Sequence, residues 1–111
     1  MGKAQRTKGH SFERLIAIKL RKLFPRARRH LEYHIGDANG IDIDNTGDFR
    51  IQCKRGKRYA PLTAIEEIQL DPIEGGIPVL ITQADRKEIL VALPLRYFLR
   101  LLKDAGHGEK K

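Results

Sequence analysis

The spacing of apolar residues predicts that the chain begins its folded part with a helix. The segment 11–24 reads SFERLIAIKLRKLF, and several of its side chains recur at helical spacing. Ser11 is a suitable N-cap, and Pro25 cannot continue a helix. The predicted stripe consists of Phe12, Leu15, Ile16, Lys19 and Leu23.

Three stretches after this helix show the period-two alternation of β-strands. They are LEYHI at 31–35, IDID at 41–44 and FRIQCKR at 49–55, and turn residues separate them. Because strand side chains alternate, Cys53 shares a face with apolar neighbours and is interpreted as a small core residue rather than a reactive thiol. The two faces of the third strand are Phe49, Ile51 and Cys53 on one side and Arg50, Gln52 and Lys54 on the other.

The second half of the chain continues with a helix, two strands and a closing helix. We expect a helix at 60–70, strands at 77–83 and 89–93 joined by a turn, and a helix from Pro94 to Gly106. The inward residues would be Ala64, Ile65 and Ile68 of the first helix and Leu95, Phe98, Leu99 and Leu102 of the second. This order predicts an α/β fold in which helices flank a mixed sheet, with the polar face of the central hairpin open.

Length and composition favour one domain without a membrane segment. The 111 residues suffice for one compact unit, which we place at 10–106, between a flexible basic arm at 1–9 and a disordered tail at 107–111. No apolar run reaches the ~18 residues of a membrane span, and the N-terminus lacks the apolar stretch of a signal peptide. Cys53 is the only cysteine, which fits a reducing compartment. We therefore expect a cytoplasmic protein.

The net charge of +8 is concentrated in two places. Residues 1–30 hold ten Lys or Arg residues and one acid, Glu13, which gives this segment a charge of +9, whereas the rest of the chain sums to −1. The second cluster is Arg50, Lys54, Arg55, Lys57 and Arg58. Clustered cations attract polyanions through counterion release, so we expect nucleic acid as the partner; the alternative is a merely solvated basic face.

The central hairpin places two acids, an amide and an ammonium in one small area. Asp42 and Asp44 share a strand face, and their mutual repulsion would be relieved by a cation such as Lys54 or by a divalent metal. Mg²⁺ bound by one or two carboxylates and by phosphate oxygens suits phosphodiester hydrolysis. The plainer alternative is that the acids cap a turn and Lys54 pairs with Asp42. Glu13 likewise fits a preference for acids at a helix start together with a pairing to a nearby arginine.

The same residues resemble a known nuclease family. GIDIDNTGDFRIQCKRGK at 40–57 resembles the metal-binding hairpin of the PD-(D/E)xK nuclease superfamily, and KGHSFERLIAIKLRKLF at 8–24 resembles its Glu-bearing first helix. The chain is most similar to archaeal-type Holliday junction resolvases, which also occur in phages; in that case the protein would act in the host cytoplasm. The Gln-x-Lys strand resembles Mrr-type restriction endonucleases. The resemblance covers roughly 8–70 and implies a restriction-endonuclease-like αβββαββα core.

The resemblance implies a role for each matching residue. Asp42 would be the principal ligand of Mg²⁺ or Mn²⁺, Glu13 would bind the metal or its water, and Lys54 would be the catalytic lysine. The backbone carbonyl of Cys53 would complete the protein ligands. Gln52 stands where the family has an acid and would offer an uncharged oxygen, so Asp44 is an additional candidate for the missing charge. Ile41 replaces the proline of the motif name.

The expected function is a Mg²⁺-dependent DNA endonuclease that resolves branched or four-way DNA as a homodimer. The residues expected to contact DNA are Lys8, Arg14, Arg28, Arg29, His34, Arg55, Lys57 and Arg58. For His34 an ordinary surface position is the alternative. Glu66, Glu67 and Gln69 are interpreted as a solvated helix face; the alternative, implied by the resemblance, is that one of them approaches the site, since the family often has a helper residue on this helix. A general or nicking duplex endonuclease, a non-catalytic DNA-binding module and an RNA-associated basic protein are the alternatives.

Overall fold

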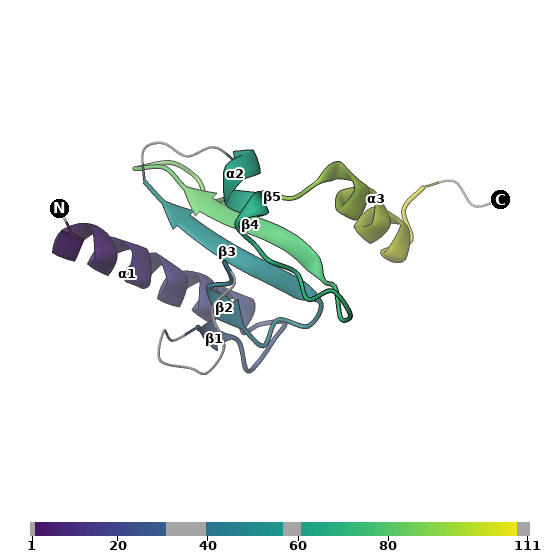
Figure 1. The fold of residues 1–111 in the computed structure, drawn as a ribbon, viewed down its shortest axis with the longest axis horizontal. Coiled ribbons are helices and arrows are strands. Elements are labelled where there is room, and N and C mark those ends of the chain that lie inside the picture. The colour runs from purple at the N-terminus through teal and green to yellow at the C-terminus, as the bar shows by residue number, and fades with distance from the viewer. Residues whose placement is uncertain (1, 31–39, 57–60, 109–111) are drawn as a thin grey trace.

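The computed structural model of the chain contains one five-stranded sheet and three helices (Figure 1). It describes residues 2–30, 40–56 and 61–108, and for residues 2–8 the backbone alone. The elements are α1 (Gly2–Leu20), β1 (Arg28–Arg29), β2 (Ile43–Asp44), β3 (Phe49–Arg55), α2 (Pro61–Glu66), β4 (Ile77–Gln83), β5 (Leu90–Ala92) and α3 (Leu95–Asp104).

The sheet has the strand order β1-β2-β3-β4-β5 and is mixed. β1, β2 and β3 pair antiparallel, β3 and β4 pair parallel, and β4 pairs antiparallel with β5. The parallel pair runs in register from Phe49 opposite Ile77 to Arg55 opposite Gln83. Parallel neighbours need a crossover, and α2 lies in this one. The predicted α/β fold with a mixed sheet and flanking helices is therefore confirmed.

One face of the sheet packs against α1 and forms the main core. Ile43, Ile51 and Cys53 are buried there, as the alternation in β3 predicts. The predicted helix stripe is only partly right, because Leu15 is 41% and Leu23 79% exposed. The inward side chains of α1 are Phe12, Ile16, Ala17 and the half-buried Leu20. In LIAI both sides of the helix are apolar, so the pattern alone does not identify the buried side.

The helix also starts earlier than its predicted N-cap at Ser11. Residues 2–9, expected as a flexible arm, are helical and continuous with the rest of α1. This stretch contains no proline, and Ala, Gln, Arg and Lys, which fill most of it, are favourable helix residues. A local cap preference at Ser11 therefore does not interrupt the helix.

The other face of the sheet is partly covered by α2. Ala64 and Ile68 are buried against it, and so is Gln52, which is only 3% exposed. The expectation of an open polar face on the central hairpin is therefore wrong at Gln52. The reason is topological: the crossover between β3 and β4 brings its helix back over this side of the strands.

The predicted strand bounds hold best in the middle of the sheet. β3 and β4 have the expected bounds, and β4 is buried over almost its whole length, as its apolar run predicts. β2 is shorter than expected, and the strand expected at 31–35 lies outside the described residues; the described first strand is β1. Within the described ranges, none of the helices combines the length and hydrophobicity needed to cross a bilayer.

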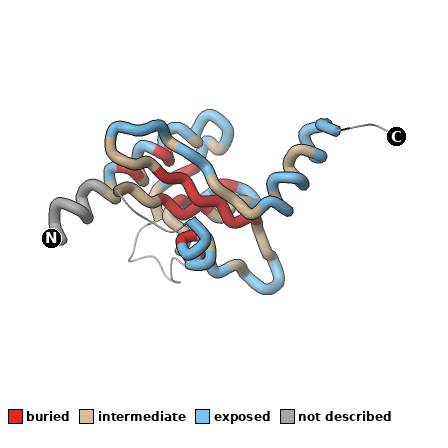
Figure 2. The backbone as a smooth tube through the Cα atoms, turned by 90° about the horizontal axis from the view of Figure 1, so that it is seen from above, coloured by how far each residue is buried: buried red, intermediate tan, exposed pale blue. Residues whose placement is uncertain are grey.

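The closing helix α3 extends away from the sheet (Figure 2). None of its residues is buried, and Leu95, Phe98 and Leu99 are 67%, 46% and 55% exposed. Only Tyr97 and Leu101 pack against the core from this helix. Its predicted apolar side therefore exists but is largely in contact with solvent.

Candidate active site

Asp42 lies where strands β2 and β3 separate. Its backbone N–H donates to the carbonyl oxygen of Ile51, and its carbonyl accepts from His30 N–H, both at 2.8 Å. The register then changes, because the backbone N–H of Cys53 donates to the Asp42 carboxylate oxygen Oδ2 at 2.8 Å. In a continued ladder, a main-chain carbonyl of β2 would take this place. The carboxylate is thus fixed by the backbone at the point of separation.

The environment of Asp42 opposes its negative charge. Burial raises the pKa of its carboxyl to about 6; the hydrogen bond from Cys53 N–H lowers the pKa, and the charge of Glu13 raises it again. Lys54 and His30 lower the pKa by smaller amounts. Glu13 and Lys54 are therefore close enough to act electrostatically on Asp42, and the structure brings these three predicted residues together.

Glu13 also forms an ion pair with β1. Its Oε1 lies 2.9 Å from Nε of Arg29, and both side chains are mostly buried. The sequence allowed two interpretations of Glu13, a metal-site acid and an acid paired with a nearby arginine, and the second contact is observed. Arg29, predicted as a DNA contact, is therefore engaged with Glu13.

Asp44 contacts a histidine that the sequence did not single out for this site. His30 Nδ1 lies 2.9 and 3.1 Å from the two oxygens of Asp44, and both side chains are partly buried. Asp44 was an additional candidate for binding a metal. Its carboxylate oxygens are directed at His30 in this structure.

Gln52 and Lys54 meet at a single carboxylate, that of Glu67. The Gln52 amide nitrogen donates to the Ala64 carbonyl at 2.8 Å and to Glu67 Oε2 at 2.7 Å. Lys54 Nζ lies 3.1 Å from the same Oε2. The hydrogen bonds from Gln52 and Lys54 hold the pKa of Glu67 below its ordinary value. Glu67 directly follows α2.

The sequence interpretation of Glu67 as part of a solvated face missed this contact. A signal was present: an amide buried on β3 beneath the crossover helix needs acceptors for its two hydrogens. The only carboxylates in the predicted helix are Glu66 and Glu67. Counting the donors of Gln52 would therefore have pointed to one of them.

Thr82 is a second residue to which the sequence assigned no role. It stands beside Lys54 in the parallel register of β3 and β4, and it is 2% exposed. Among the residues that the structure describes, its hydroxyl is the only buried side-chain polar atom without a hydrogen-bond partner.

The predicted DNA contacts fall into three groups. Arg14 and Arg28 are exposed and line a hollow of about 370 Å³ between α1 and β1, together with Arg21 and Arg29. Arg55 instead pairs with Asp85, at 2.5 Å, and is mostly buried. His34, Lys57 and Arg58, with the side chain of Lys8, lie outside the described part of the chain.

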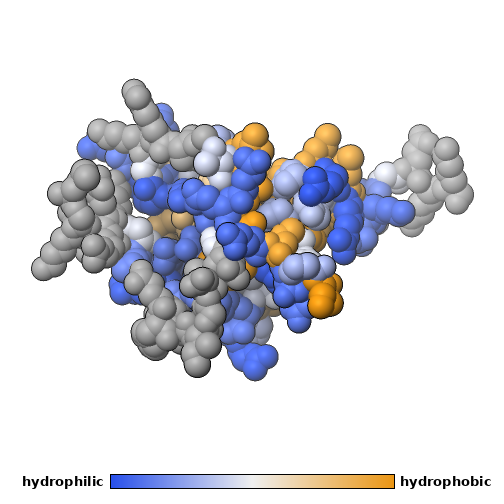
Figure 3. Space-filling model, viewed as in Figure 1, coloured by the Kyte–Doolittle hydropathy of each residue, from blue (hydrophilic) through white to orange (hydrophobic). Residues whose placement is uncertain are grey.

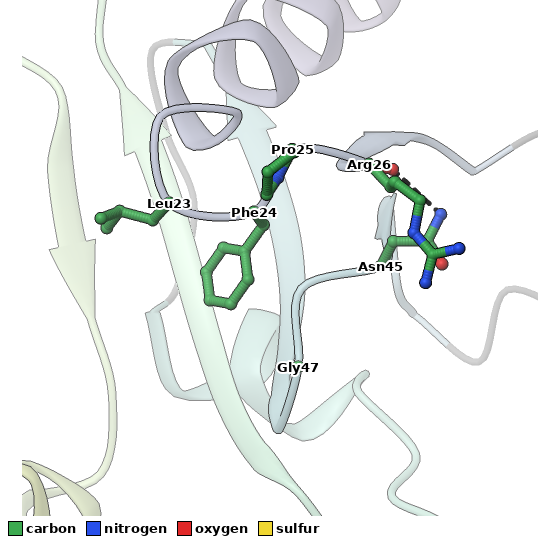
Figure 4. Close-up of a pocket in the computed structure, with 6 residues that line it drawn as sticks. All are labelled: Leu23, Phe24, Pro25, Arg26, Asn45 and Gly47. Carbon is green, nitrogen blue, oxygen red and sulfur yellow. Dashed lines mark hydrogen bonds between the residues drawn. The ribbon is translucent and has the colours of Figure 1, made fainter.

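A larger hollow, of about 620 Å³, lies near the start of β3, away from the end that carries Lys54 and Arg55 (Figure 4). Leu23, Phe24, Pro25, Arg26, Asn45 and Gly47 line it. The Asn45 side chain bridges its walls by donating to the Arg26 carbonyl at 3.0 Å. Among the described residues that line it, Arg26 is the only ionisable one.

The donor set around Asp42 is compatible with a hard divalent cation. Within the described residues no cluster of three or more His, Cys, Asp or Glu side chains could hold a metal. Mg²⁺, however, commonly takes one or two carboxylates and completes its shell with water and phosphate. Asp42 and Glu13 supply the carboxylates, and the Cys53 carbonyl faces the same strand edge as its N–H. A cation there would relieve the unfavourable charge of Asp42.

Cys53 itself takes no part through its thiol. Burial, with the charges of Asp42 and Glu13, raises the pKa of this thiol far above its ordinary value. The side chain stays neutral and packs in the core, which confirms its interpretation as a core residue.

Comparisons with protein-family models, with curated proteins and with solved structures found no match to this chain.

Proposed function

We propose that this protein is a Mg²⁺-dependent DNA endonuclease with a restriction-endonuclease-like core. The observation that carries the proposal is the buried Asp42 carboxylate, held by Cys53 N–H where two strands separate, with Glu13 and Lys54 acting on it electrostatically. Turn capping does not account for this position, because the turn begins beyond Asp44. The order of one helix, an antiparallel three-stranded unit, a crossover helix and a parallel strand also supports it.

Each residue has a definite task in this proposal. Asp42 and the Cys53 carbonyl hold the metal, and Glu13 binds the metal or its water. When bound, Mg²⁺ lowers the pKa of a water and polarises the phosphate. Lys54 orients the attacking water and stabilises the negative charge that develops on the phosphate. The exposed Arg14 and Arg28 bind backbone phosphates, which positions the DNA without reading its sequence.

The proposed substrate is a four-way junction, and the proposed active form is a homodimer. A junction has two-fold symmetry and needs paired cuts, whereas one chain offers one site. An enzyme that nicks one strand of a duplex needs no such pairing. The nature of the substrate thus separates the resolvase from a general endonuclease.

The closing helix α3 and the edge strand β5 suit the dimer interface. Leu90 and Val91 of β5 are 58% and 60% exposed, and an apolar groove of about 480 Å³ lies between α3 and the sheet. In Figure 3 the hydrophobic side chains lie in the half of the molecule that carries α3, where hydrophilic side chains surround them. An interface is more apolar in its buried centre than the rest of the surface.

The apolar side of α3 suits an antiparallel pair with the same helix of a second copy. In such a pair Phe98 of one copy packs against Leu102 of the other. A second copy of the chain therefore fits this helix in its apolar pattern.

The test uses a labelled four-way junction, a linear duplex of the same sequence and a splayed fork. The protein and its Asp42→Ala variant are incubated with each, with Mg²⁺ or with chelator. We expect paired, symmetric cuts in the junction that require both Mg²⁺ and Asp42. Cleavage of all three substrates would move the assignment to a general endonuclease.

A second candidate is a DNA-binding module without catalysis. It is favoured by Gln52, which is uncharged and bonded to α2 through its amide nitrogen. In that case the junction would be bound but not cut, and Asp42→Ala would bind as well or better, because it removes a negative charge from a phosphate-binding surface.

A further inference from the structure

The orientation of the Gln52 amide follows from two neighbours, one on α2 and one directly after it. The Ala64 carbonyl and the Glu67 carboxylate are both acceptors, and they lie 2.8 and 2.7 Å from the same nitrogen. A carboxamide carries its two hydrogens on that nitrogen and none on its oxygen. The opposite orientation would place three oxygens together. The nitrogen therefore faces α2, and Oε1 is directed away from these two acceptors.

The same two neighbours disfavour an acid at position 52. A glutamate there would direct a carboxylate oxygen at the Ala64 carbonyl and at a second carboxylate, in a site that is 3% exposed. Unpaired like charges of this kind are strongly unfavourable when they are buried. The glutamine is thus matched to the acceptors on α2. One negative charge remains in the group, and Glu67 carries it.

Glu67 also contacts Lys54, whose Nζ lies 3.1 Å from the oxygen that accepts from Gln52. One carboxylate oxygen consequently holds the amide and the ammonium two residues apart on β3. The side chains of Lys54 and Glu67 are 40% and 47% exposed. An ion pair this exposed adds little to stability, so its effect is on position rather than on folding.

The backbone fixes Glu67 relative to the strand that carries Asp42. A Cβ added at Gly40 would lie 2.2 Å from the Glu67 carbonyl oxygen, so the chain just before β2 touches the end of α2 directly. Gly40 has a φ of 75°, which glycine adopts without strain. The end of α2 and the approach to Asp42 are therefore in backbone contact.

We propose that Glu67, directly after the crossover helix, is a positioning residue that orients Gln52 and Lys54 and supplies the negative charge that an acid at position 52 would otherwise provide. The Gln52 oxygen is thereby directed away from these two acceptors, and the Lys54 ammonium is held at the Glu67 carboxylate. The orientation of Gln52 stands on geometry alone, whereas the effect on cleavage rests on the proposed nuclease function.

The test compares Glu67→Gln, Gln52→Glu and the double variant that exchanges the two residues. Glu66→Gln is the matched control, since it removes the same charge one residue away. We expect Glu67→Gln to lower cleavage and to raise the Mg²⁺ concentration at half-maximal rate by about 10- to 100-fold, the usual range for residues that orient metal ligands. The exchange should recover part of the activity that Gln52→Glu loses, because the amide at position 67 donates to the carboxylate at position 52, although the Ala64 carbonyl then lacks its donor.

A readout independent of cleavage is the side-chain amide of Gln52 in ¹H–¹⁵N spectra. Its two protons should exchange slowly with solvent in the wild-type protein and in Glu66→Gln, and faster in Glu67→Ala. If Glu67→Gln cleaves like Glu66→Gln, or the Gln52 amide is unchanged in Glu67→Ala, the positioning role is wrong. If the wild-type protein cleaves nothing, the nuclease proposal fails, and the amide measurement still decides the orientation of Gln52.

Discussion

At the scale of single residues, Asp42 combines a buried position with a carboxylate that must be ionised to bind a cation. Its pKa of about 6 lies above the ordinary value of 3.8, because burial and the charge of Glu13 outweigh the contributions of the Cys53 N–H, Lys54 and His30. The folded state therefore retains the Asp42 proton up to about pH 6, and above this pH the carboxylate is ionised and can bind a cation.

This raised pKa predicts a pH-dependent stability. Protonated Asp42 contributes to the free energy of unfolding fully below pH 3.8, and this contribution is lost as the pH rises through about 6. The free energy of unfolding therefore falls by about 3 kcal/mol between these two limits. Asp42→Asn keeps an acceptor for Cys53 N–H and stays neutral. We expect this variant to be more stable than the wild type at about pH 8 and similar to it at about pH 4.

Urea unfolding with chelator at the two pH values measures this directly. The difference between variant and wild type isolates Asp42, since other titrating groups are common to both proteins. An equal difference at both pH values would show that Asp42 is not perturbed in the folded state.

The positions of single residues could be predicted where the spacing along a strand determines them. They could not be predicted where the contacting residue lies on another helix or strand. Strand alternation in the sequence indicated that Asp42 and Lys54 share one area, and the structure has them within electrostatic reach of each other. The contacts of Asp44 with His30 and of Gln52 with Glu67 join residues 14 and 15 positions apart. Such pairings depend on how β1 and α2 pack, which alternation does not specify.

At the scale of elements, the accuracy of the sequence prediction follows the strength of each pattern. β3 alternates along its full length and β4 is a continuous apolar run, and both were predicted with their observed bounds. α1 has apolar residues on two sides, and packing on the sheet decides which side is buried. The buried side carries Phe12, Ile16 and Leu20. The exposed side carries Leu15, Lys19 and Leu23. The bounds of α1 also exceed the local cap signal at Ser11.

The exposed side of α3 yields a prediction for the assembly. Leu99 is 55% exposed, so Leu99→Glu should leave the fold intact and place a charge inside the proposed dimer interface. We expect light scattering to give the mass of a single chain for this variant and of two chains for the wild type. The thermal midpoint of the monomeric state should change little.

Arg100→Glu provides the control, because Arg100 is exposed on α3 and pairs only weakly with Asp104, at 3.9 Å. It introduces the same side chain one residue away from the apolar side. A wild-type protein with the mass of one chain would rule out this interface. If both variants have the mass of two chains, as the wild type does, the interface lies elsewhere.

At the scale of the whole molecule, the charge is distributed asymmetrically. The segment 1–30 holds +9 of charge while the net charge is +8, and Arg14 and Arg28 from this segment are exposed around one hollow. Arg29 and Arg55 are occupied by Glu13 and Asp85. The sequence located the basic segment correctly, but which arginines are available could be decided only from the ion pairs.

This distribution predicts how DNA binding responds to salt. The double variant Arg14→Ala/Arg28→Ala should bind duplex and junction more weakly by a similar factor, and the slope of log affinity against log salt should fall by about 2, one for each phosphate that is no longer neutralised. Lys87→Ala, an exposed cation in the turn between β4 and β5, should leave the slope unchanged. Fluorescence anisotropy across a salt series measures both; equal slopes for all three proteins would exclude Arg14 and Arg28 from the interface.

The close approach at Gly40 limits what sequences this fold accepts. The space beside its Cα holds a hydrogen atom and nothing larger, since a methyl carbon would lie 2.2 Å from a main-chain oxygen that no rotamer change can move. In a library with all twenty amino acids at position 40, selection for a folded protein should return glycine alone. The exposed Asn45, whose φ is 65°, should also accept glycine, with loss of the hydrogen bond from its side chain to the Arg26 carbonyl. Position 40 therefore serves as a sequence marker by which distant versions of this chain could be recognised.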